Sequence, residues 1–431
     1  MPSIMQSIKE KDRQYIWHPF TSFTSAPEPI PILKGEGLYL VDEAGNRYMD
    51  TISSWWVTLH GHAHPYIAER IYRQALQLEQ VIFAGFTHQP AVELAERLIK
   101  ILPHNFAKIF YSDNGSTSTE VAIKMAIQFW WNTSTPGKPV ERDKILAFRN
   151  SYHGDTFGAM SVSERSVFTM AFQEKLFDVL FIDTPEPGNI ETLKTFISSH
   201  GEQIAAFIYE PILQGAGGMK MYEPALLSEI LYACKQNAII CIADEVMTGF
   251  GRTGRLFASD HLEVKPDIIC LSKGLTGGTM ALGVTACTQR IVDAFITNDK
   301  LKTFFHGHSF TANPLACSAA LASLDLLQME DCLKNIEAIT ASNKRFAKQL
   351  RHQSHAKNVR CCGTIVAFEY DKGIDEYLNN ISQEITAYML DRGIYLRPLG
   401  NTVYIMPPYC ITQAELEKVY EAIIEFINLE K

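Results

Sequence analysis

The stretch AIICIADEVMTGFGRTG, residues 238–254, decides the fold class of this chain. It begins as an apolar run rich in isoleucine, which is typical of a strand buried on both faces of a parallel sheet. The run ends in Asp244, and a carboxylate at the end of a buried strand costs free energy unless it is paired. A G-x-G-x-x-G pattern follows at Gly249, Gly251 and Gly254. The stretch therefore raises two hypotheses, a dinucleotide fingerprint or a carboxylate placed for chemistry.

The spacing of these glycines disfavours a dinucleotide site. Fingerprint glycines follow their strand at once and open a helix within a βαβ unit. Here Gly249 comes five positions after Asp244, and the residues after Gly254, RLFASDHLEVKPD, show no helical start. We interpret the glycines as a tightly turning loop and Asp244 as the informative residue.

Further strand-like runs lie on both sides of this stretch, and segments of helical periodicity separate many of them. The apolar runs are KIFYSD (108–113), KILAFRN (144–150), AAFIYE (205–210) and DIICLSK (267–273), and two of the helical segments are 91–102 and 224–236. This alternation predicts an α/β fold with a mostly parallel sheet and helices on both faces. Functional groups in such sheets gather at the carboxyl ends of the strands.

The two ends of the chain have a different pattern. GLYLVDEAGNRYMDT (37–51) predicts a hairpin that turns at residues 43–46. After about residue 330, helical patterns flank VRCCGTIVAFEY (359–370) and VYIMPP (403–408). We expect residues 1–60 and 330–431 to form a small α+β domain, packed on a large domain of residues 61–329.

The composition is that of an ordinary globular protein of 431 residues, with a net charge of −9 and 46% hydrophobic residues. The mild acidity and the lack of a Lys/Arg block argue against nucleic acid or a membrane surface as a partner. MPSIMQSIKEKDRQY (1–15) has no apolar core of a signal peptide, and no apolar run approaches the ~20 residues of a membrane span. Nine cysteines without a C-x-x-C pair predict reduced thiols and a cytoplasmic protein.

The strand that follows Asp244 along the chain ends in Lys273. If the two strands are neighbours, an acid and an amine face one crevice. A structural ion pair would explain this arrangement, and such pairs also perturb pKa values. The alternative is a lysine that forms a Schiff base, because desolvation makes a lysine amine nucleophilic.

A third feature lies in KIFYSDNGSTSTEVAIKMA (108–126). The strand ends near residue 113, Asn114-Gly115 turns, and the hydroxyls of residues 116–119 are candidate caps for a following helix. The free N–H groups and the dipole of a helix start suit phosphate, although an ordinary capped helix has the same pattern. Phosphate site, acid and lysine together match pyridoxal phosphate, which requires all three.

The chain resembles class III aminotransferases of fold type I, over nearly its whole length. The resemblance implies pyridoxal phosphate as cofactor and a seven-stranded large-domain sheet. The matching motifs are WHPFTS (17–22), SSWW (53–56), FRNSYHGDTFGAMS (148–161), EPILQGAGGM (210–219), IADEVMTGFGRTG (242–254), SKGLTGGTM (272–280), NPLAC (313–317) and RPLGNTVYIMPPY (397–409).

WHPFTS, SSWW and YHGDTFGAMS place the resemblance closer to members that act in biotin synthesis. It implies ping-pong transamination of 8-amino-7-oxononanoate to 7,8-diaminononanoate, with S-adenosylmethionine as amino donor. Lysine as donor, or the activity of another class III ω-amino acid aminotransferase, are the alternatives.

Five residues match family positions that hold the cofactor. The resemblance implies that Lys273 bonds to it and acts as the catalytic base, and that Asp244 pairs with its ring nitrogen. It implies that Gly115 and Ser116 bind the phosphate and that Tyr152 stacks on the ring. An aromatic face is a sensible partner for a flat ring.

Other matching residues concern the substrate and a second subunit. Trp55 and Phe20 are expected to line the substrate pocket, and Arg397 to bind the substrate carboxylate through its planar guanidinium. Gly307, His308 and Ser309 are expected to reach the cofactor phosphate in the active site of a partner subunit. The resemblance thus implies a homodimer with shared active sites.

Three positions depart from the family pattern. Ser309 stands for the usual threonine and keeps the hydroxyl, whereas His308 stands where proline is expected. Phe20 stands where a tyrosine is associated with S-adenosylmethionine as donor. Phenylalanine cannot donate that hydrogen bond, which is why the donor stays open.

Several polar residues have alternative interpretations. His60, His62 and His64 alternate as metal ligands could, but Gly and Pro neighbours and the missing carboxylate or cysteine favour a polar loop and no metal. Asp155 could orient a substrate amine or cap a turn. Arg252 could contact substrate, but we favour a solvated loop charge.

Overall fold

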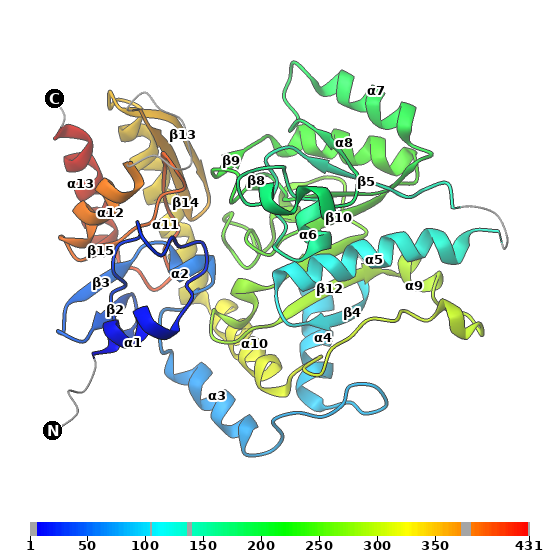
Figure 1. Ribbon diagram of the computed structural model, residues 1–431, viewed down its shortest axis with the longest axis horizontal. Helices are drawn as coiled ribbons and strands as arrows, with labels where there is room; N and C mark the ends of the chain where they lie inside the picture. The colour runs from blue at the N-terminus through cyan, green and yellow to red at the C-terminus, as the bar shows by residue number, and fades with distance from the viewer. Residues whose placement is uncertain (1–6, 104–105, 136–139, 372–380, 430–431) are drawn as a thin grey trace.

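The computed structural model describes residues 7–103, 106–135, 140–371 and 381–429, and Figure 1 shows their arrangement. Met1–Gln6, part of the N-terminal stretch considered above for a signal peptide, lies outside the described residues. A large α/β part and a smaller part built from both ends of the chain lie side by side (Figure 1).

The large part contains a seven-stranded sheet with the order β4-β12-β11-β10-β7-β5-β6. All its strands run parallel except β12, which pairs antiparallel with β4 and β11. The predicted mostly parallel, seven-stranded sheet is confirmed. Its strands are β4 (Phe106–Ser112), β5 (Lys144–Phe148), β6 (Val179–Ile182), β7 (Ile204–Tyr209), β10 (Ile240–Asp244), β11 (Ile268–Leu271) and β12 (Gly283–Thr288).

Strands β10 and β11 are direct neighbours, as the hypothesis about Asp244 and Lys273 requires. Their side chains alternate between the two sides of the sheet, which explains why both runs are apolar throughout. Ile240 and Ile242 pack with residues of α5 (Gly115–Thr133), whereas Cys241 and Ala243 belong to the core on the other face.

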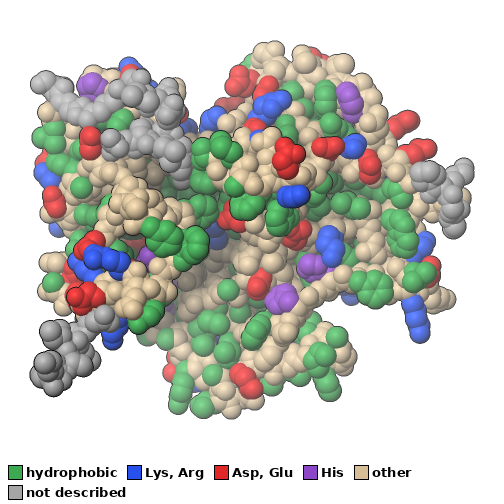
Figure 2. All heavy atoms as spheres, in the orientation of Figure 1, with side chains coloured by type: hydrophobic (Ala, Val, Ile, Leu, Met, Phe, Trp, Pro, Cys, Tyr) green, Lys and Arg blue, Asp and Glu red, His purple; other side chains and the backbone are tan. Residues whose placement is uncertain are grey.

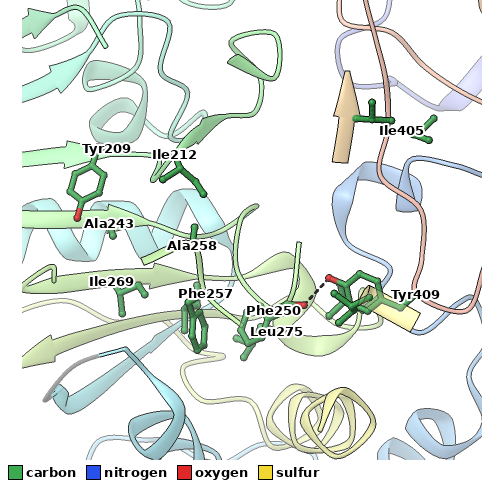
Figure 3. Close-up of a cluster of buried hydrophobic side chains, with 14 of the residues drawn as sticks. Tyr209, Ile212, Ala243, Phe250, Phe257, Ala258, Ile269, Leu275, Ile405 and Tyr409 are labelled. Atoms are coloured by element: carbon green, nitrogen blue, oxygen red, sulfur yellow. Dashed lines mark hydrogen bonds between the residues drawn. The ribbon is translucent and has the colours of Figure 1, made fainter. Parts of the chain in front are cut away.

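Helices cover both faces of this sheet, as predicted. Helix α5 lies across one face, against β7, β11 and β12. The core of the other face includes side chains of α4 (Gln89–Ile101), α7 (Ile190–His200) and α8 (Pro224–Gln236). Figure 3 shows Tyr209, Ala243 and Ile269 of three neighbouring strands in this second core, continuous with Phe257 and Leu275.

Two small sheets form the other part of the molecule. One has the order β1-β2-β3-β15, and the other β13-β14-β16. The predicted hairpin is confirmed as β2 and β3, and β15 adds to β3 in parallel, with Ile394 opposite Met49. This pairing joins the two ends of the chain, while the division at residues 60 and 330 stays a prediction. The strands are β1 (Ile32–Glu36), β2 (Tyr39–Asp42), β3 (Arg47–Asp50), β13 (Ala356–Cys362), β14 (Ile365–Tyr370), β15 (Ile394–Tyr395) and β16 (Thr402–Ile405).

The remaining elements complete the two parts. They are α1 (Ile8–Tyr15), α2 (Ser53–Trp56), α3 (Pro65–Ala75), α6 (Phe157–Ser161), α9 (Gln289–Asp293), α10 (Pro314–Leu327), α11 (Glu330–Leu350), α12 (Ile381–Leu390), α13 (Gln413–Asn428), the ribbon β8 (Leu213–Gln214) with β9 (Lys220–Met221), and the 3-10 turns η1 (Met170–Lys175), η2 (Ala258–His261), η3 (Lys273–Thr276) and η4 (Lys300–Lys302).

Charges of both signs are scattered over the face shown in Figure 2, in keeping with the mixed composition. Among the described residues, every helix is too short or too polar to cross a lipid bilayer. All nine cysteines are free thiols.

Candidate active site

A cavity of about 420 Å³ opens at the carboxyl edge of the large sheet, a size within the ~300–1,000 Å³ typical of ligand sites. It brings together five residues that were singled out in the sequence. Lys273 follows β11, Asp244 ends β10, and Gly115 and Ser116 begin α5. Tyr152 joins them from the loop after β5. The parallel sheet explains the meeting, because the carboxyl ends of parallel strands lie at one edge.

Lys273 lies in a strained and desolvated position. Its φ of 45° is uncommon for a residue with a side chain and indicates strain at a functional position. The Nζ atom lies 4.7 Å from the centroid of the Trp56 ring. Burial lowers the pKa of the Lys273 amine, and the carboxylates of Asp244 and Glu210 only oppose this effect. The amine therefore loses its proton more readily than the amine of an exposed lysine, which favours its action as a base and nucleophile.

Asp244 is held in one orientation by two contacts. Its Oδ2 lies 2.7 Å from Nδ1 of His153, and its Oδ1 accepts a hydrogen bond of 3.0 Å from the backbone N–H of Val246. His153 is buried, and its Nε2 has no hydrogen-bond partner among the described residues. The pair fixes a carboxylate that faces the cavity, where it can accept a hydrogen bond from a protonated ring nitrogen.

Glu210, Trp56 and His153 were not selected from the sequence. Glu210 ends AAFIYE, the run of β7, just as Asp244 ends the run of β10. The argument applied to Asp244 would have found it, since a carboxyl group closes a buried strand in both cases. Burial raises the pKa of Glu210 to about 7, while hydrogen bonds from the backbone N–H groups of Gly215 and Tyr152 oppose this shift.

The start of α5 forms the anion-binding wall of the cavity. The cap is Asn114, whose side chain accepts from the N–H of Thr117 at 2.9 Å, while the Thr117 hydroxyl accepts from the N–H of Asn114 at 3.1 Å. The hydroxyls of residues 116–119 were therefore the wrong candidates for the cap itself. Gly115 needs its missing side chain, because a Cβ there would lie 2.6 Å from Val246. Ser116 remains free of the cap, and its Oγ accepts from the N–H of Asp155 at 3.2 Å.

An aromatic chain runs outward from this cavity. The Tyr152 ring lies 6.4 Å from that of Phe168, and Phe168 lies 5.7 Å from Phe20. Phe20 in turn lies 5.6 Å from Trp55, and the Arg397 guanidinium lies 5.3 Å from the Trp55 centroid. The expected substrate residues Phe20, Trp55 and Arg397 thus lie together, outside the cavity lining but joined to Tyr152 through Phe168. Phe168 was missed because nothing around it in the sequence marks it as part of a site.

The SSWW motif of α2 contains three residues with an uncommon backbone conformation. Ser53, Ser54 and Trp56 have φ values of 53°, 60° and 66°. The Ser53 hydroxyl donates to the carbonyl of Met406, and Trp56 Nε1 donates to the Tyr404 hydroxyl at 2.9 Å. The turn leaves Trp55 exposed and buries its neighbour Trp56. Trp55 therefore contacts Arg397, whereas Trp56 lies beside Lys273.

Gly307, His308 and Ser309 do not line the cavity within this chain. The carbonyl of Ser309 accepts a hydrogen bond of 2.7 Å from Gln80, and His308 Nδ1 accepts from the N–H of Phe310. The expected contact with a partner subunit stays a prediction.

The structure corrects the interpretation of Arg252. It is fully buried, not solvated, and donates to the carbonyls of Pro407 at 2.9 Å and Thr58 at 3.1 Å. Burial lowers the pKa of this guanidinium. The expectation failed because the sequence shows Arg252 inside a glycine-rich loop, whereas tertiary packing covers that loop with the ends of the chain.

Two of the three histidines considered above, and Asp155, take partners within the chain, whereas the buried Nδ1 of His64 has no hydrogen-bond partner among the described residues. His62 pairs with Asp50 at 2.8 Å, and His60 lies 3.1 Å from the hydroxyl of Ser323. Burial lowers the pKa of His60 to about 3, so its imidazole stays neutral. The Asp155 carboxylate accepts the hydroxyl of Tyr152 at 2.8 Å.

The glycines of 249–254 lie in turns, and the next element is the short 3-10 turn η2 rather than an α-helix. The predicted tightly turning loop is confirmed.

The cavity fits pyridoxal phosphate in the chemistry of its walls. A helix start with a glycine and a serine hydroxyl that can still donate its proton suits a phosphate, and the oriented carboxylate of Asp244 suits a ring nitrogen. A desolvated amine, Lys273, faces the same space and suits an aldehyde carbon.

Comparisons with known proteins agree with this chemistry. The chain is 44% identical over 424 residues to the adenosylmethionine-8-amino-7-oxononanoate aminotransferase of Synechococcus elongatus, covering 96% of this chain and 98% of the relative. It is 38% identical to the protein of the same name from Geobacter sulfurreducens, covering 98% of each. The crystal structure of the protein of that name from Methanocaldococcus jannaschii superposes with a TM-score of 0.92 at 36% identity, covering 97% of this chain and 98% of the other. Residues 22–427 match the family Aminotransferase class-III, and the chain belongs to this family of pyridoxal-phosphate-dependent enzymes.

Proposed function

We propose that this aminotransferase converts 8-amino-7-oxononanoate to 7,8-diaminononanoate in biotin synthesis, with S-adenosylmethionine as the amino donor. The proposal rests on one observation: a chain that matches relatives named for this reaction over nearly its whole length gathers Lys273, Asp244 and the start of α5 around one cavity. Other class III aminotransferases share this cavity chemistry, so the substrate assignment depends on the named relatives and on the aromatic wall.

Four residues besides Lys273 would hold the cofactor. The N–H groups at the start of α5, with Gly115 and the Ser116 hydroxyl, would bind its phosphate. Asp244, oriented by His153, would keep the ring nitrogen protonated, and Tyr152 would lie against the ring. When bound, pyridoxal phosphate carries the amino group between substrates and withdraws electrons from the substrate Cα.

Lys273 would supply the proton transfers. In the first half-reaction its amine would take the proton from the donor Cα. In the second half-reaction it would deliver a proton to C7 of the acceptor. A lowered pKa supports this role, because a base must be partly neutral at the working pH. Asp244 and Glu210 face the same space, and their negative charges raise the pKa of Lys273 against the effect of burial, so that the amine can also hold a proton.

Arg397 and the aromatic residues would bind the acceptor. The guanidinium of Arg397 offers two parallel N–H groups to the terminal carboxylate of 8-amino-7-oxononanoate. Trp55, Phe20 and Tyr152 provide apolar surface for its hydrocarbon chain.

Phe20 keeps the identity of the donor open to experiment. The names of the relatives support S-adenosylmethionine, whereas Phe20 lacks the hydroxyl that is associated with this donor, which leaves lysine as the alternative.

We also propose a homodimer in which Gly307, His308 and Ser309 reach the active site of the partner subunit. The segment carries Phe305 and Phe310, which are 71% and 62% exposed in the single chain and would be covered by a partner. Nine free thiols support a cytoplasmic location.

The decisive assay supplies the purified holoenzyme with 8-amino-7-oxononanoate and either S-adenosylmethionine or lysine, and measures the diamine by mass spectrometry. Diamine from S-adenosylmethionine supports the proposal, and diamine from lysine alone corrects the donor. Turnover of the keto acids of ornithine or 4-aminobutyrate, without any diamine, would replace the proposal with the ω-amino acid activity.

Replacing the proposed base tests the chemistry independently of the substrates. Lys273→Ala is expected to lower turnover by a factor of at least ~10³, because the proposed base is removed together with the proposed covalent link to the cofactor. The variant should also lose the visible absorbance that the bound cofactor gives the wild-type enzyme. Retention of both signals would contradict the assignment of Lys273.

A further inference from the structure

A second cavity of about 340 Å³ adjoins the first across Tyr152. Tyr152 and Gly154 line both cavities, so the two spaces meet at the residue expected to lie against the cofactor. Residues 160–169 form much of the remaining wall, with Ala216 and Gly217 opposite. Glu164 and Phe168 also lie in this wall.

The charged groups that line this cavity are all acidic. Among the described residues of its wall, Asp155 and Glu164 are carboxylates, and the wall contains no lysine, arginine or histidine. Arg165 follows Glu164 in the chain, but its guanidinium donates to the carbonyls of Ser161 at 2.8 Å and Ser163 at 3.0 Å. The cavity is therefore suited to a cation.

Glu164 is fixed in place rather than free to turn into solvent. Its Oε2 accepts from the N–H of Asn150 at 2.9 Å, and its Oε1 accepts from the N–H of Arg165 at 3.1 Å. Asn150 has a φ of 60°, a left-handed conformation that asparagine tolerates and that aims its N–H at Glu164. Each carboxylate oxygen accepts more than one hydrogen bond, so both can also contact a ligand.

Aromatic rings complete a cation site. Tyr152 and Phe168 line the cavity, and their centroids lie 6.4 Å apart in an edge-to-face arrangement. A cation over an aromatic face gains roughly 0.5–2 kcal/mol, more when it is desolvated. Phe168 also touches Phe20, which connects this cavity to the wall that ends in Arg397.

The wall thus has opposite charges at its two ends. Carboxylates lie near Phe168, and a guanidinium lies beyond Trp55. The two substrates of the proposed reaction differ by one positive charge. The acceptor carries one amino group and one carboxylate, whereas both candidate donors carry a further cation on the side chain besides their α-amino and α-carboxylate groups, a sulfonium in S-adenosylmethionine and an ammonium in lysine.

We propose that the second cavity binds the side-chain cation of the amino donor, through the Glu164 carboxylate and the face of Phe168. This inference rests on the proposed function. It explains how one active site accepts two substrates of different charge: the extra cation of the donor binds in the second cavity. It requires no change in the position of the cofactor, because Tyr152 borders both spaces.

The test uses the holoenzyme and the Glu164→Gln variant, with whichever donor supports turnover. Glutamine has nearly the same shape and keeps an oxygen for one of the two backbone N–H groups. Loss of the charge should raise the donor KM about tenfold, as expected for one charge-assisted contact, and leave the KM for 8-amino-7-oxononanoate unchanged. The control is Glu263→Gln, which removes an exposed carboxylate before β11, at the opposite edge of the sheet, and should leave both KM values as in the wild type.

A second variant keeps the proposal testable if Glu164→Gln does not fold. Phe168→Leu retains an apolar side chain but removes the aromatic face, and it should raise the donor KM by about threefold to tenfold. An unchanged donor KM in the folded variants, or an equal rise in both KM values, would overturn the inference while diamine formation continues. Absence of diamine in the wild-type enzyme with either donor would instead remove the proposed function.

Discussion

At the scale of single residues, two buried glutamates show how the fold alters ionisation. Glu210 closes β7 beside the active site, and Glu245 follows Asp244 on the way to η2. Burial raises the pKa of each to about 7. Glu245 accepts hydrogen bonds of 2.7 Å from the N–H groups of Ala258 and Ser259, which oppose the shift without removing it. Both carboxyl groups therefore hold a proton at a pH where exposed glutamates have lost it.

Glu245 makes a prediction about stability and pH. Its ordinary pKa is 4.5 and its value in the folded chain is about 7, so between these values the folded state binds a proton that the unfolded state has lost. The stabilisation is complete below about pH 4.5 and is lost as the pH rises through 7, an effect of about 3 kcal/mol. At pH 5, Glu245→Gln should be less stable than the wild type. Between pH 5 and pH 8, the thermal midpoint of the variant should fall by less than that of the wild type.

The exposed Glu263→Gln variant controls for the change in net charge, and its midpoint should fall with pH as in the wild type. A Glu245→Gln variant with the same fall as the wild type would show that the carboxyl of Glu245 ionises at an ordinary pH.

At the scale of secondary structure, the site depends on how the first turn of α5 meets the loop after β5. Ser116 on the helix and Gly154 on the loop are in direct contact, and Gly154 has a φ of 132°. A Cβ on Gly154 would lie 2.1 Å from the Ser116 hydroxyl and 2.8 Å from its Cα. The proposed phosphate site and the Tyr152 loop can approach each other only because this residue has no side chain.

Gly154→Ala should therefore separate the two elements. We expect a loss of about 2–3 kcal/mol in stability from strain and displacement, together with weaker cofactor binding, since Ser116 and Tyr152 move apart. Thermal melts and a titration of the apoenzyme with pyridoxal phosphate measure the two effects.

Gly188→Ala is the matched control, because a Cβ at Gly188 would meet no atom within 4 Å and should change neither quantity. Wild-type cofactor affinity in Gly154→Ala would show that the contact between helix and loop does not form part of the binding site.

At the scale of the whole molecule, the two ends of the chain close over the loop that follows Asp244. Arg252 donates to carbonyls of Thr58 and Pro407, and the Tyr409 hydroxyl donates to the carbonyl of Phe250 at 2.7 Å (Figure 3). These bonds connect the turning glycine loop to both the N-terminal and the C-terminal segments. The same bonds hold the part of the chain that carries Lys273 in a fixed position relative to the part that carries Arg397.

Arg252→Met tests this connection. The variant keeps an apolar side chain of similar length but leaves buried carbonyls without donors, which should destabilise the protein by about 3 kcal/mol or more. Chemical denaturation measures the loss. Arg255→Met removes an exposed guanidinium three residues away and should stay within about 0.5 kcal/mol of the wild type. Equal stability of the two variants would mean that Arg252 does not hold the chain ends.

The sequence by itself determined the large sheet, the hairpin at 37–51 and the residues at the strand ends that meet around the cavity. Strands buried in a sheet have a recognisable local sequence pattern, an apolar run that ends in a polar residue. The sequences at β4, β10 and β11 all show this pattern. The run that ends in Glu210 shows the same pattern, and it could have predicted Glu210 as a site residue as well. Because parallel strands place their carboxyl ends at one edge, residues 29 positions apart, Asp244 and Lys273, could be expected in one crevice.

Only the tertiary structure decided the burial of Arg252, the contact between His153 and Asp244, and the second cavity with Glu164 and Phe168. Each depends on segments that meet from distant parts of the chain, and no local pattern of polarity records which loop will cover another. Burial, and with it the pKa of Lys273 and Glu210, is a property of that packing, because desolvation is set by the neighbours that exclude water.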